Sequence, residues 1–251
     1  MTQTHVCRHI GALLIGVLPL MAWGADLTVC AAASLTEAFK ELGPVFEAQA
    51  SGTKVLFNFG ASDALLAQIG RGAPADVFAS ADQEAMDRAE TRNLLSPGSR
   101  RNFASNSLVV VTPSDSTLGL FALADLRLPD VRRVALGSAA SPFGRYARGA
   151  LESAGLWTEI APKAVYGQNV RQSLDYVARG EVEAGFVYLT DAAVRKDKVK
   201  VAFAVTTSTP ISYPIAAVAG STNPEAARRF VAYVSSPSAQ AVLARYGFGK
   251  P

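Results

Sequence analysis

The sequence predicts an α/β protein of two lobes, each a mostly parallel sheet flanked by helices, with a ligand cleft between the lobes. Short apolar runs alternate with segments of helical periodicity almost throughout the chain. That alternation is typical of parallel strands joined by helical crossovers. The apolar run at 107–113 predicts a strand that has no obvious place in the first set of strands and helices, and the alternation begins again after it. The interruption indicates two units, and a cleft between two units is a common place for a ligand.

The first residues have the pattern of a secretory signal peptide. Arg8 supplies a basic start, residues 10–21 are apolar, and Ala22 and Gly24 are the small residues that signal peptidase reads. We therefore expect residues 1–24 to be cleaved and the mature protein to be periplasmic. A retained membrane anchor is the alternative, but the apolar run is short for a membrane-spanning helix.

The first lobe is predicted to comprise residues 25–106 and 212–251. A helix with one apolar face follows its first strand, and the chain returns to this lobe at its end. We expect strands at 27–31, 54–59, 75–80 and 212–220, and helices at 35–46, 63–72, 82–93, 224–235 and 238–246.

The second lobe is predicted to comprise residues 107–211. Its alternation of strand and helix resembles that of the first lobe, so we expect the same kind of sheet. Strands are expected at 107–113, 133–137, 163–167, 183–188 and 199–205, and helices at 142–154 and 170–179.

Composition excludes several classes of chemistry. Loss of the signal peptide removes His5, His9 and Cys7, which leaves no histidine and only Cys30. A Ser-His-Asp triad, a Cys-His pair and a histidine-ligated zinc are therefore excluded. The net charge of +3 is small and its basic residues are scattered, unlike a nucleic-acid-binding surface. We expect a monomer that is not an enzyme, needs no cofactor and binds no nucleic acid.

Four predicted helices begin just beyond the carboxyl end of a strand, each at a short polar residue. These residues are Ser34, Ser62, Ser141 and Asn169, and Ser34 with Glu37 has the spacing of a capping box. Simple capping of the helix would explain any one of them. In open parallel sheets, however, ligands lie outside the carboxyl ends of the strands. Four helix starts facing one cleft would therefore favour an anion.

The donors at these helix starts are neutral. No lysine or arginine lies at the first two starts, so backbone N–H groups and serine hydroxyls would hold the anion. A fully ionised oxyanion only accepts hydrogen bonds and suits such a site. A protonated oxyanion such as hydrogen phosphate also donates, and it would need an acceptor. The sequence therefore predicts a site made of donors for a fully ionised oxyanion.

Several phrases of the sequence together resemble the periplasmic molybdate-binding proteins of ABC-type importers. They are AAASLTEAF, FGAS, RGAPADVFASADQEAMD, NSLVVV, QNVRQSLDYVARGEVEAGFVYLTDA and RYGF, and they run from residue 27 to residue 248. The resemblance implies the type II periplasmic-binding-protein fold, whose two lobes close on molybdate or tungstate. It also implies delivery of the ion to an inner-membrane ABC permease.

The resemblance also implies the ligand positions. Ser34 and Ser62 would each donate through the backbone N–H and the hydroxyl, Phe143 and Val170 through the backbone N–H, and Tyr188 through its hydroxyl. The metal of the oxyanion would be held only through its oxygens, with no direct metal ligand. The phenyl ring at position 143 would have to point away from the anion. A buried structural tyrosine is the alternative for position 188.

Four charged residues near these positions need an interpretation. Asp63 would repel an anion if it faced the site, so we expect it to face solvent. Arg171 beside Val170 could add long-range attraction for the anion, but we expect it to be exposed without a role. Asp76 and Asp82 could form a catalytic carboxylate pair, but a turn position and a helix cap explain them better.

Three other functions compete with molybdate binding. The nearest is a binder of sulfate, another oxyanion that only accepts hydrogen bonds and differs from molybdate in size. A secreted hydrolase with Ser34 as nucleophile and a lysine as base is a second, although no Ser-x-x-Lys spacing begins there. An envelope module with a vestigial cleft is the third.

Overall fold

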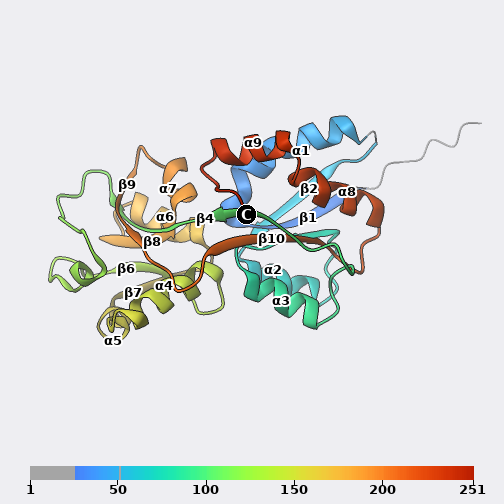
Figure 1. The fold of residues 1–251 in the computed structure, drawn as a ribbon. Helices are drawn as coiled ribbons and strands as arrows, with labels where there is room; N and C mark the ends of the chain where they lie inside the picture. The colour runs from blue at the N-terminus through green and yellow to red at the C-terminus, as the bar shows by residue number, and fades with distance from the viewer. Residues whose placement is uncertain (1–25, 51) are drawn as a thin grey trace, which may run out of the picture.

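The computed structural model describes residues 26–50 and 52–251, so the predicted signal peptide at 1–24 lies outside the described residues. Two lobes lie side by side, and each is built on a five-stranded sheet flanked by helices (Figure 1). The predicted fold class is confirmed.

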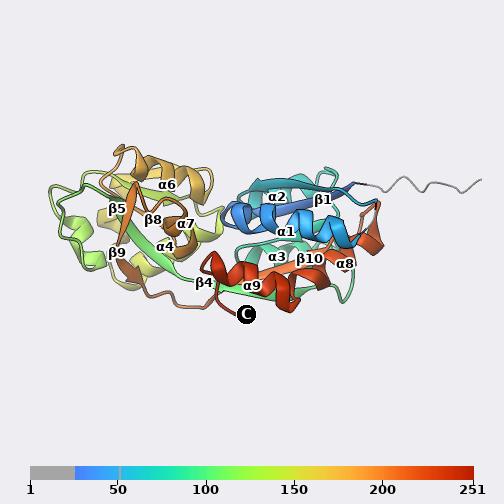
Figure 2. The same ribbon diagram turned by 90° about the horizontal axis from the view of Figure 1, so that it is seen from above.

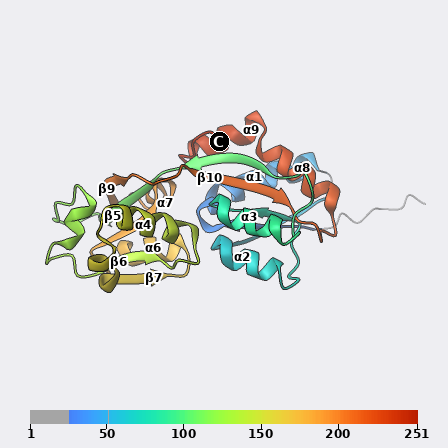
Figure 3. The same cartoon turned by 60° about the horizontal axis from the view of Figure 1, so that its bottom comes forward.

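The first lobe contains both ends of the described chain. Its strands lie in the order β2-β1-β3-β10-β4. Helices α1, α8 and α9 cover one face of this sheet (Figure 2), and α2 and α3 cover the other (Figure 3). The bounds are β1 Leu27–Ala32, α1 Thr36–Gln49, β2 Val55–Gly60, α2 Ser62–Ile69, β3 Val77–Ala79, α3 Gln83–Thr91, β4 Arg101–Asn106, β10 Ile211–Ala217, α8 Pro224–Val234 and α9 Pro237–Arg245.

The two faces of the first sheet have separate cores. Aromatic side chains dominate the face under α1 and α8, where the rings of Phe46 and Phe230 pack edge to face with centroids 5.1 Å apart. Aliphatic side chains such as Leu65 and Met86 fill the face under α2 and α3. These cores fix the start of each helix against the end of a strand.

The second lobe has the strand order β7-β6-β8-β5-β9. Helices α4 and α5 cover one face of its sheet, and α6 and α7 cover the other (Figure 1). The bounds are β5 Leu108–Pro113, β6 Val134–Gly137, α4 Pro142–Ser153, α5 Trp157–Ile160, β7 Ala164–Gly167, α6 Val170–Ala178, β8 Ala184–Tyr188, α7 Leu189–Val194 and β9 Val199–Val205.

Each sheet has one reversed strand, and in both cases it is the strand that enters from the other lobe. β10 pairs antiparallel with β3 and β4, and β5 pairs antiparallel with β8 and β9. The remaining strands of each sheet run parallel to one another, which matches the predicted, mostly parallel sheets. The chain crosses between the lobes at Ser107 and again at 206–210, and β10 begins at Ile211, one residue before the expected return.

The sequence patterns did not predict β4, α5 or α7. β4 pairs with β10 at the edge of the first sheet. Only Phe103 and Ala104 of this strand are buried, so its apolar signal is weak. The strand nevertheless matters, because it carries the chain into the first crossing.

Candidate functional site

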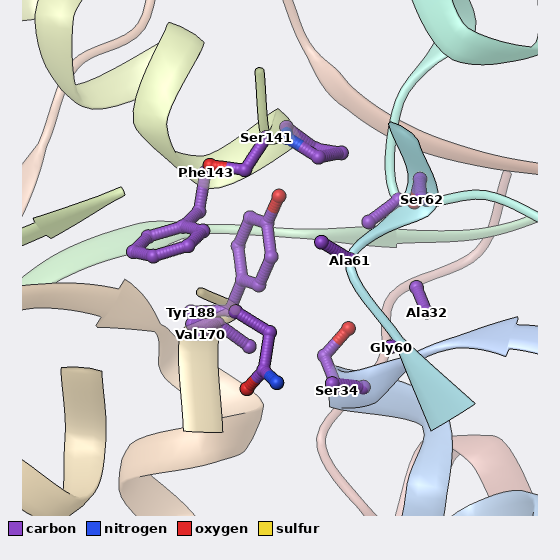
Figure 4. A pocket seen from close by; sticks show the side chains of 13 residues that line it. Ala32, Ser34, Gly60, Ala61, Ser62, Ser141, Phe143, Val170 and Tyr188 are labelled. Carbon is purple, nitrogen blue, oxygen red and sulfur yellow. The ribbon is translucent and has the colours of Figure 1, made fainter. Parts of the chain in front are cut away.

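A pocket with a cavity volume of ≈ 20 Å³ lies between the lobes (Figure 4). Drug-sized ligands occupy pockets of about 300–1,000 Å³, so this one suits a smaller guest. All five predicted ligand residues line it, and none of the lining residues is charged. They are Ala32, Ala33, Ser34, Gly60, Ala61, Ser62, Ala81, Ser141, Pro142, Phe143, Asn169, Val170 and Tyr188.

The carboxyl ends of strands from both lobes meet at this pocket. β1 and β2 end there in the first lobe, and β6, β7 and β8 end there in the second. Small residues stand where the first-lobe strands end: Ala32 and Gly60 are the last residues of β1 and β2, and Ala33 and Ala61 follow them. Side chains of this size leave the first N–H groups of the helices open to a guest.

Capping explains one of the four predicted helix starts. The Asn169 side chain accepts hydrogen bonds from the N–H groups of Arg171 at 2.9 Å and Gln172 at 3.1 Å, as predicted. The prediction of a capping box at Ser34 and Glu37 is wrong. A 3₁₀ turn at Ala33–Leu35 precedes α1, and the Ser34 hydroxyl bonds to the hydroxyl of Tyr213 at 2.9 Å instead of a helical N–H.

The side chains of the other two serines do not cap their helices either, although Ser141 stands at the N-cap position of α4 and is followed by Pro142, as predicted. Ser62 is the first residue of α2, and its Oγ accepts a hydrogen bond from the backbone N–H of Ala81 at 3.0 Å. Its own hydroxyl hydrogen therefore stays available. The Ser141 hydroxyl instead donates to the carbonyl oxygen of Ser138 at 2.8 Å. Of these two serines, Ser62 is the one equipped to donate a side-chain hydrogen bond into the pocket.

Tyr188 ends β8 and directs its hydroxyl toward the pocket (Figure 4). Its side chain is buried, and within the described residues its Oη has no hydrogen-bond partner. Burial raises the pKa of Tyr188 well above the ordinary value, so the hydroxyl keeps its proton. A buried, unsatisfied hydroxyl calls for a partner, and a guest in the pocket would supply one.

The start of α4 is pressed against the end of β6. A Cβ added at Gly144 would lie 2.1 Å from the carbonyl oxygen of Ser138, and one added at Gly137 would lie 2.6 Å from the Phe143 ring. This close approach brings the backbone at position 143 to the pocket. The Phe143 ring points away from Ser34 and Ser62, as a bound anion would require (Figure 4). Neither glycine was predicted to matter, although Gly137 ends a predicted strand and Gly144 lies in the first turn of a predicted helix.

The prediction that Asp63 faces solvent is wrong. Its side chain is 9% exposed and pairs with Arg88 of α3 and, at 3.0 Å, with Arg145 of α4 in the other lobe. Arg145 also pairs with Asp82 and lies 3.1 Å from Glu84. The positive guanidinium groups offset the repulsion that Asp63 would exert on an anion.

Arg171 is not a surface residue without contacts, contrary to prediction. Its Nη1 donates to Glu37 of the first lobe at 3.1 Å, and its Nε lies 2.6 Å from Asp191 of its own lobe. Burial raises the pKa of Asp191 to about 6, against the opposing charge of Arg171. Arg145 and Arg171 thus tie the lobes together beside the pocket. A single sequence gave no sign of these pairs, because each joins residues far apart in the chain.

The two remaining carboxylates have separate structural partners. Asp76 accepts hydrogen bonds from the Thr28 N–H at 2.7 Å and from the Ser221 hydroxyl at 2.6 Å. Asp82 caps α3 by accepting from the Ala85 N–H at 3.1 Å.

In the described part of the chain, no group of three or more histidine, cysteine and acidic residues could hold a metal ion. No helix there is both long enough and apolar enough to cross a membrane.

Known proteins resemble this chain over nearly all of its described length. The family of bacterial extracellular solute-binding proteins matches residues 27–249. The molybdate-binding protein ModA of Escherichia coli (strain K12) is 36% identical over 228 residues, which cover 88% of each chain. ModA of Haemophilus influenzae is 33% identical, covering 94% of this chain and 95% of that protein.

A solved structure extends the likeness to the fold. The periplasmic molybdate-binding protein of Azotobacter vinelandii superposes with a TM-score of 0.77 and is 24% identical, covering 90% of this chain and 99% of that one. The superposition extends over both lobes, so the two proteins share the fold described above. The family match and the identity to the curated relatives lead to one conclusion: the chain belongs to the family of bacterial extracellular solute-binding proteins.

Proposed function

We propose that this protein captures molybdate, and also tungstate, in the periplasm and delivers it to an ABC permease of the inner membrane. The observation that carries the proposal is the small interlobe pocket, which is lined only by uncharged residues and by the starts of helices. The relatives from Escherichia coli and Haemophilus influenzae carry the name molybdate-binding protein, which supports this choice of ligand. Export by a cleaved signal peptide and action as a monomer without a cofactor or catalytic step are part of the proposal.

Five residues would form the ligand shell. Ser34 and Ser62 would donate through the hydroxyl and the backbone N–H, Phe143 and Val170 through the backbone N–H, and Tyr188 through its hydroxyl. Hydrogen bonds to a charged group contribute about 1.5–3 kcal/mol each. Several such bonds, less the costs of desolvation and lobe closure, correspond to a dissociation constant between about 1 μM and 1 nM.

Calorimetric titration with molybdate, tungstate, sulfate and phosphate tests this function. Phosphate should bind weakest, because it carries a proton and the proposed shell consists only of donors. Molybdate and tungstate should bind more tightly than sulfate, as the names of the relatives suggest. Thermal unfolding gives a second measure, since a hundredfold excess of ligand over its dissociation constant should add about 2.7 kcal/mol of stability. Tighter binding of sulfate than of molybdate would make the protein a sulfate binder, and no stabilisation by any of the four ions would reject the proposal.

Replacing Tyr188 with phenylalanine should weaken molybdate binding by about tenfold, the lower end for one hydrogen bond to a charged group. The hydroxyl is buried without a partner in the described structure, so the change removes a donor and leaves no protein group unsatisfied. The ring should keep its packing on Tyr213, whose centroid lies 5.8 Å away. Titration of the purified variant measures the effect, and wild-type affinity would remove Tyr188 from the ligand shell.

Replacing Arg145 with glutamine should weaken molybdate binding by about tenfold, because closure would then bury Asp63 and Asp82 without their interlobe partner. Arg148 offers a matched control, since it lies on the same helix but pairs with Glu152 of its own lobe at 2.7 Å. Arg148→Gln should bind as the wild type does. Solution scattering with molybdate should give a larger radius of gyration for Arg145→Gln than for the control. Equal radii of gyration together with equal molybdate affinities would contradict the prediction.

A further inference from the structure

A chain of three hydrogen-bonding side chains runs from the first crossing between the lobes to the pocket. Asn106 ends β4, Tyr213 lies on β10, and Ser34 lies in the turn before α1. The Asn106 Nδ2 atom is 3.2 Å from the Tyr213 hydroxyl, which is 2.9 Å from the Ser34 Oγ. We call these three residues the donor chain.

The surroundings of Asn106 determine which way its amide faces. The backbone N–H of Ser107 can only donate, and it lies 2.9 Å from the Asn106 Oδ1. The amide nitrogen must therefore face the other side, toward Tyr213 and the Thr190 Oγ1, which is 2.9 Å away. Since an amide NH₂ only donates, Asn106 gives a hydrogen bond to the Tyr213 oxygen.

The direction of the next hydrogen bond follows. Within the described residues, the two partners of the Tyr213 hydroxyl are Asn106 and Ser34. Asn106 donates, so the Tyr213 hydrogen is satisfied only by the Ser34 Oγ. Tyr213 is buried, and burial raises its pKa well above the ordinary value, so this hydrogen is present at neutral pH. The Ser34 Oγ therefore accepts a hydrogen bond from Tyr213, and its own hydroxyl hydrogen remains available to a guest in the pocket.

We propose that Asn106 and Tyr213 are positioning residues that hold Ser34 as a donor and so make the pocket select oxyanions that carry no proton. The inference rests on the proposed function, because it takes Ser34 as a contact of the bound oxyanion. Neither positioning residue lines the pocket, so both act through Ser34.

The arrangement behind Ser62 is equivalent. Its Oγ accepts from the Ala81 backbone N–H at 3.0 Å, so both first-lobe serine hydroxyls that line the pocket are supplied with a donor from within the protein. If Ser34 accepted a hydrogen bond from a protonated guest, its own hydrogen would have no acceptor, because Tyr213 already donates to Ser34 and cannot receive it. A buried donor without an acceptor is costly, and this cost disfavours a protonated guest.

Two substitutions disturb the donor chain in different ways. Tyr213→Phe removes the hydrogen bond to Ser34 and frees the serine to rotate. Asn106→Asp keeps the shape of the side chain but replaces the NH₂ donor with an acceptor. Tyr213 would then donate to the new carboxylate, and Ser34 would donate to Tyr213 and turn a lone pair toward the pocket. Tyr233→Phe is the matched control, because Tyr233 lies in the same lobe but packs on Phe46 with ring centroids 5.5 Å apart.

The test measures two quantities for the wild type and each variant. One is the affinity for molybdate, and the other is the concentration of sulfate or phosphate needed to displace bound molybdate. At slightly alkaline pH both competitors are dianions of similar size, but phosphate carries a proton and sulfate does not. Tyr213→Phe should weaken molybdate binding by about tenfold. Asn106→Asp should shift the phosphate-to-sulfate preference toward phosphate by about tenfold. The new charge at position 106 repels both dianions alike, so the ratio isolates the reversed hydrogen bonds.

The outcomes separate this inference from the proposed function. A wild-type preference for sulfate over phosphate that shifts in Tyr213→Phe and Asn106→Asp, but not in Tyr233→Phe, supports the donor chain. An unchanged preference in the variants, with molybdate still bound by the wild type, overturns the donor chain alone. Wild-type protein that binds no molybdate overturns the proposed function. If thermal unfolding finds Tyr213→Phe unfolded, Asn106→Asp decides the question by itself.

Discussion

Replacing Gly144 with alanine is expected to abolish detectable molybdate binding and to lower the free energy of unfolding by about 3 kcal/mol, the upper end for an overpacked site. The added Cβ would lie 2.1 Å from the Ser138 carbonyl oxygen and 2.6 Å from the Gly137 carbonyl carbon. Both are backbone atoms at the end of β6, so neither can rotate aside. The start of α4 would have to move away, and the N–H of Phe143 would move with it.

The same helix provides the control. An added Cβ at Gly149 meets no atom within 4 Å. Alanine there should raise stability by about 0.5–1 kcal/mol, because glycine is unfavourable inside a helix. Urea unfolding and molybdate titration of the two variants measure both effects. Wild-type affinity in Gly144→Ala would mean that the close contact between α4 and β6 does not position the site.

Replacing Ser62 with alanine is expected to weaken molybdate binding by at least about tenfold, because a hydrogen bond to a charged group is lost. The substitution also removes the acceptor of the buried Ala81 N–H, so stability should fall as well. Ser34→Ala should weaken binding by a similar factor, since the Ser34 hydroxyl is the other side-chain donor of the first lobe. Titration calorimetry of each purified variant gives the dissociation constants.

Ser141 allows a sharp comparison. It is buried and lines the same pocket, but its hydroxyl already donates to the Ser138 carbonyl oxygen at 2.8 Å. Ser141→Ala should therefore change molybdate affinity by less than about threefold, well below one hydrogen bond to a charged group. Equal losses in Ser62→Ala and Ser141→Ala would show that the loss reflects general damage to the pocket and not the missing donor.

Most of the fold could be predicted because buried parallel strands and amphipathic helices leave clear patterns. The apolar strands at 27–31 and 107–113 and the helix at 142–154 are examples, and the structure has β1, β5 and α4 there. β4 was missed, since an edge strand with few buried residues has little apolar signal. Its place in the sheet depends on β10, which is more than a hundred residues later in the chain.

The sequence predicted residues that line one pocket, but not the contacts that these residues make. Polar residues after strands predicted which segments meet at the pocket. The role of each hydroxyl depends on partners from elsewhere in the fold, such as Tyr213 for Ser34 and Ala81 for Ser62. The expectations for Asp63 and Arg171 failed for the same reason, because their partners Arg145 and Glu37 belong to the opposite lobe. Local sequence carries no record of such long-range pairs.

The uncharged lining of the pocket has a consequence for unloading. A guest held without counter-ions keeps its full charge throughout, and none of the lining side chains has an acid or base form that interchanges near neutral pH. Release of the bound ion would then need no proton, no exchanging cation and no redox step. Mechanical separation of the lobes would suffice, because water can replace each hydrogen bond as it breaks.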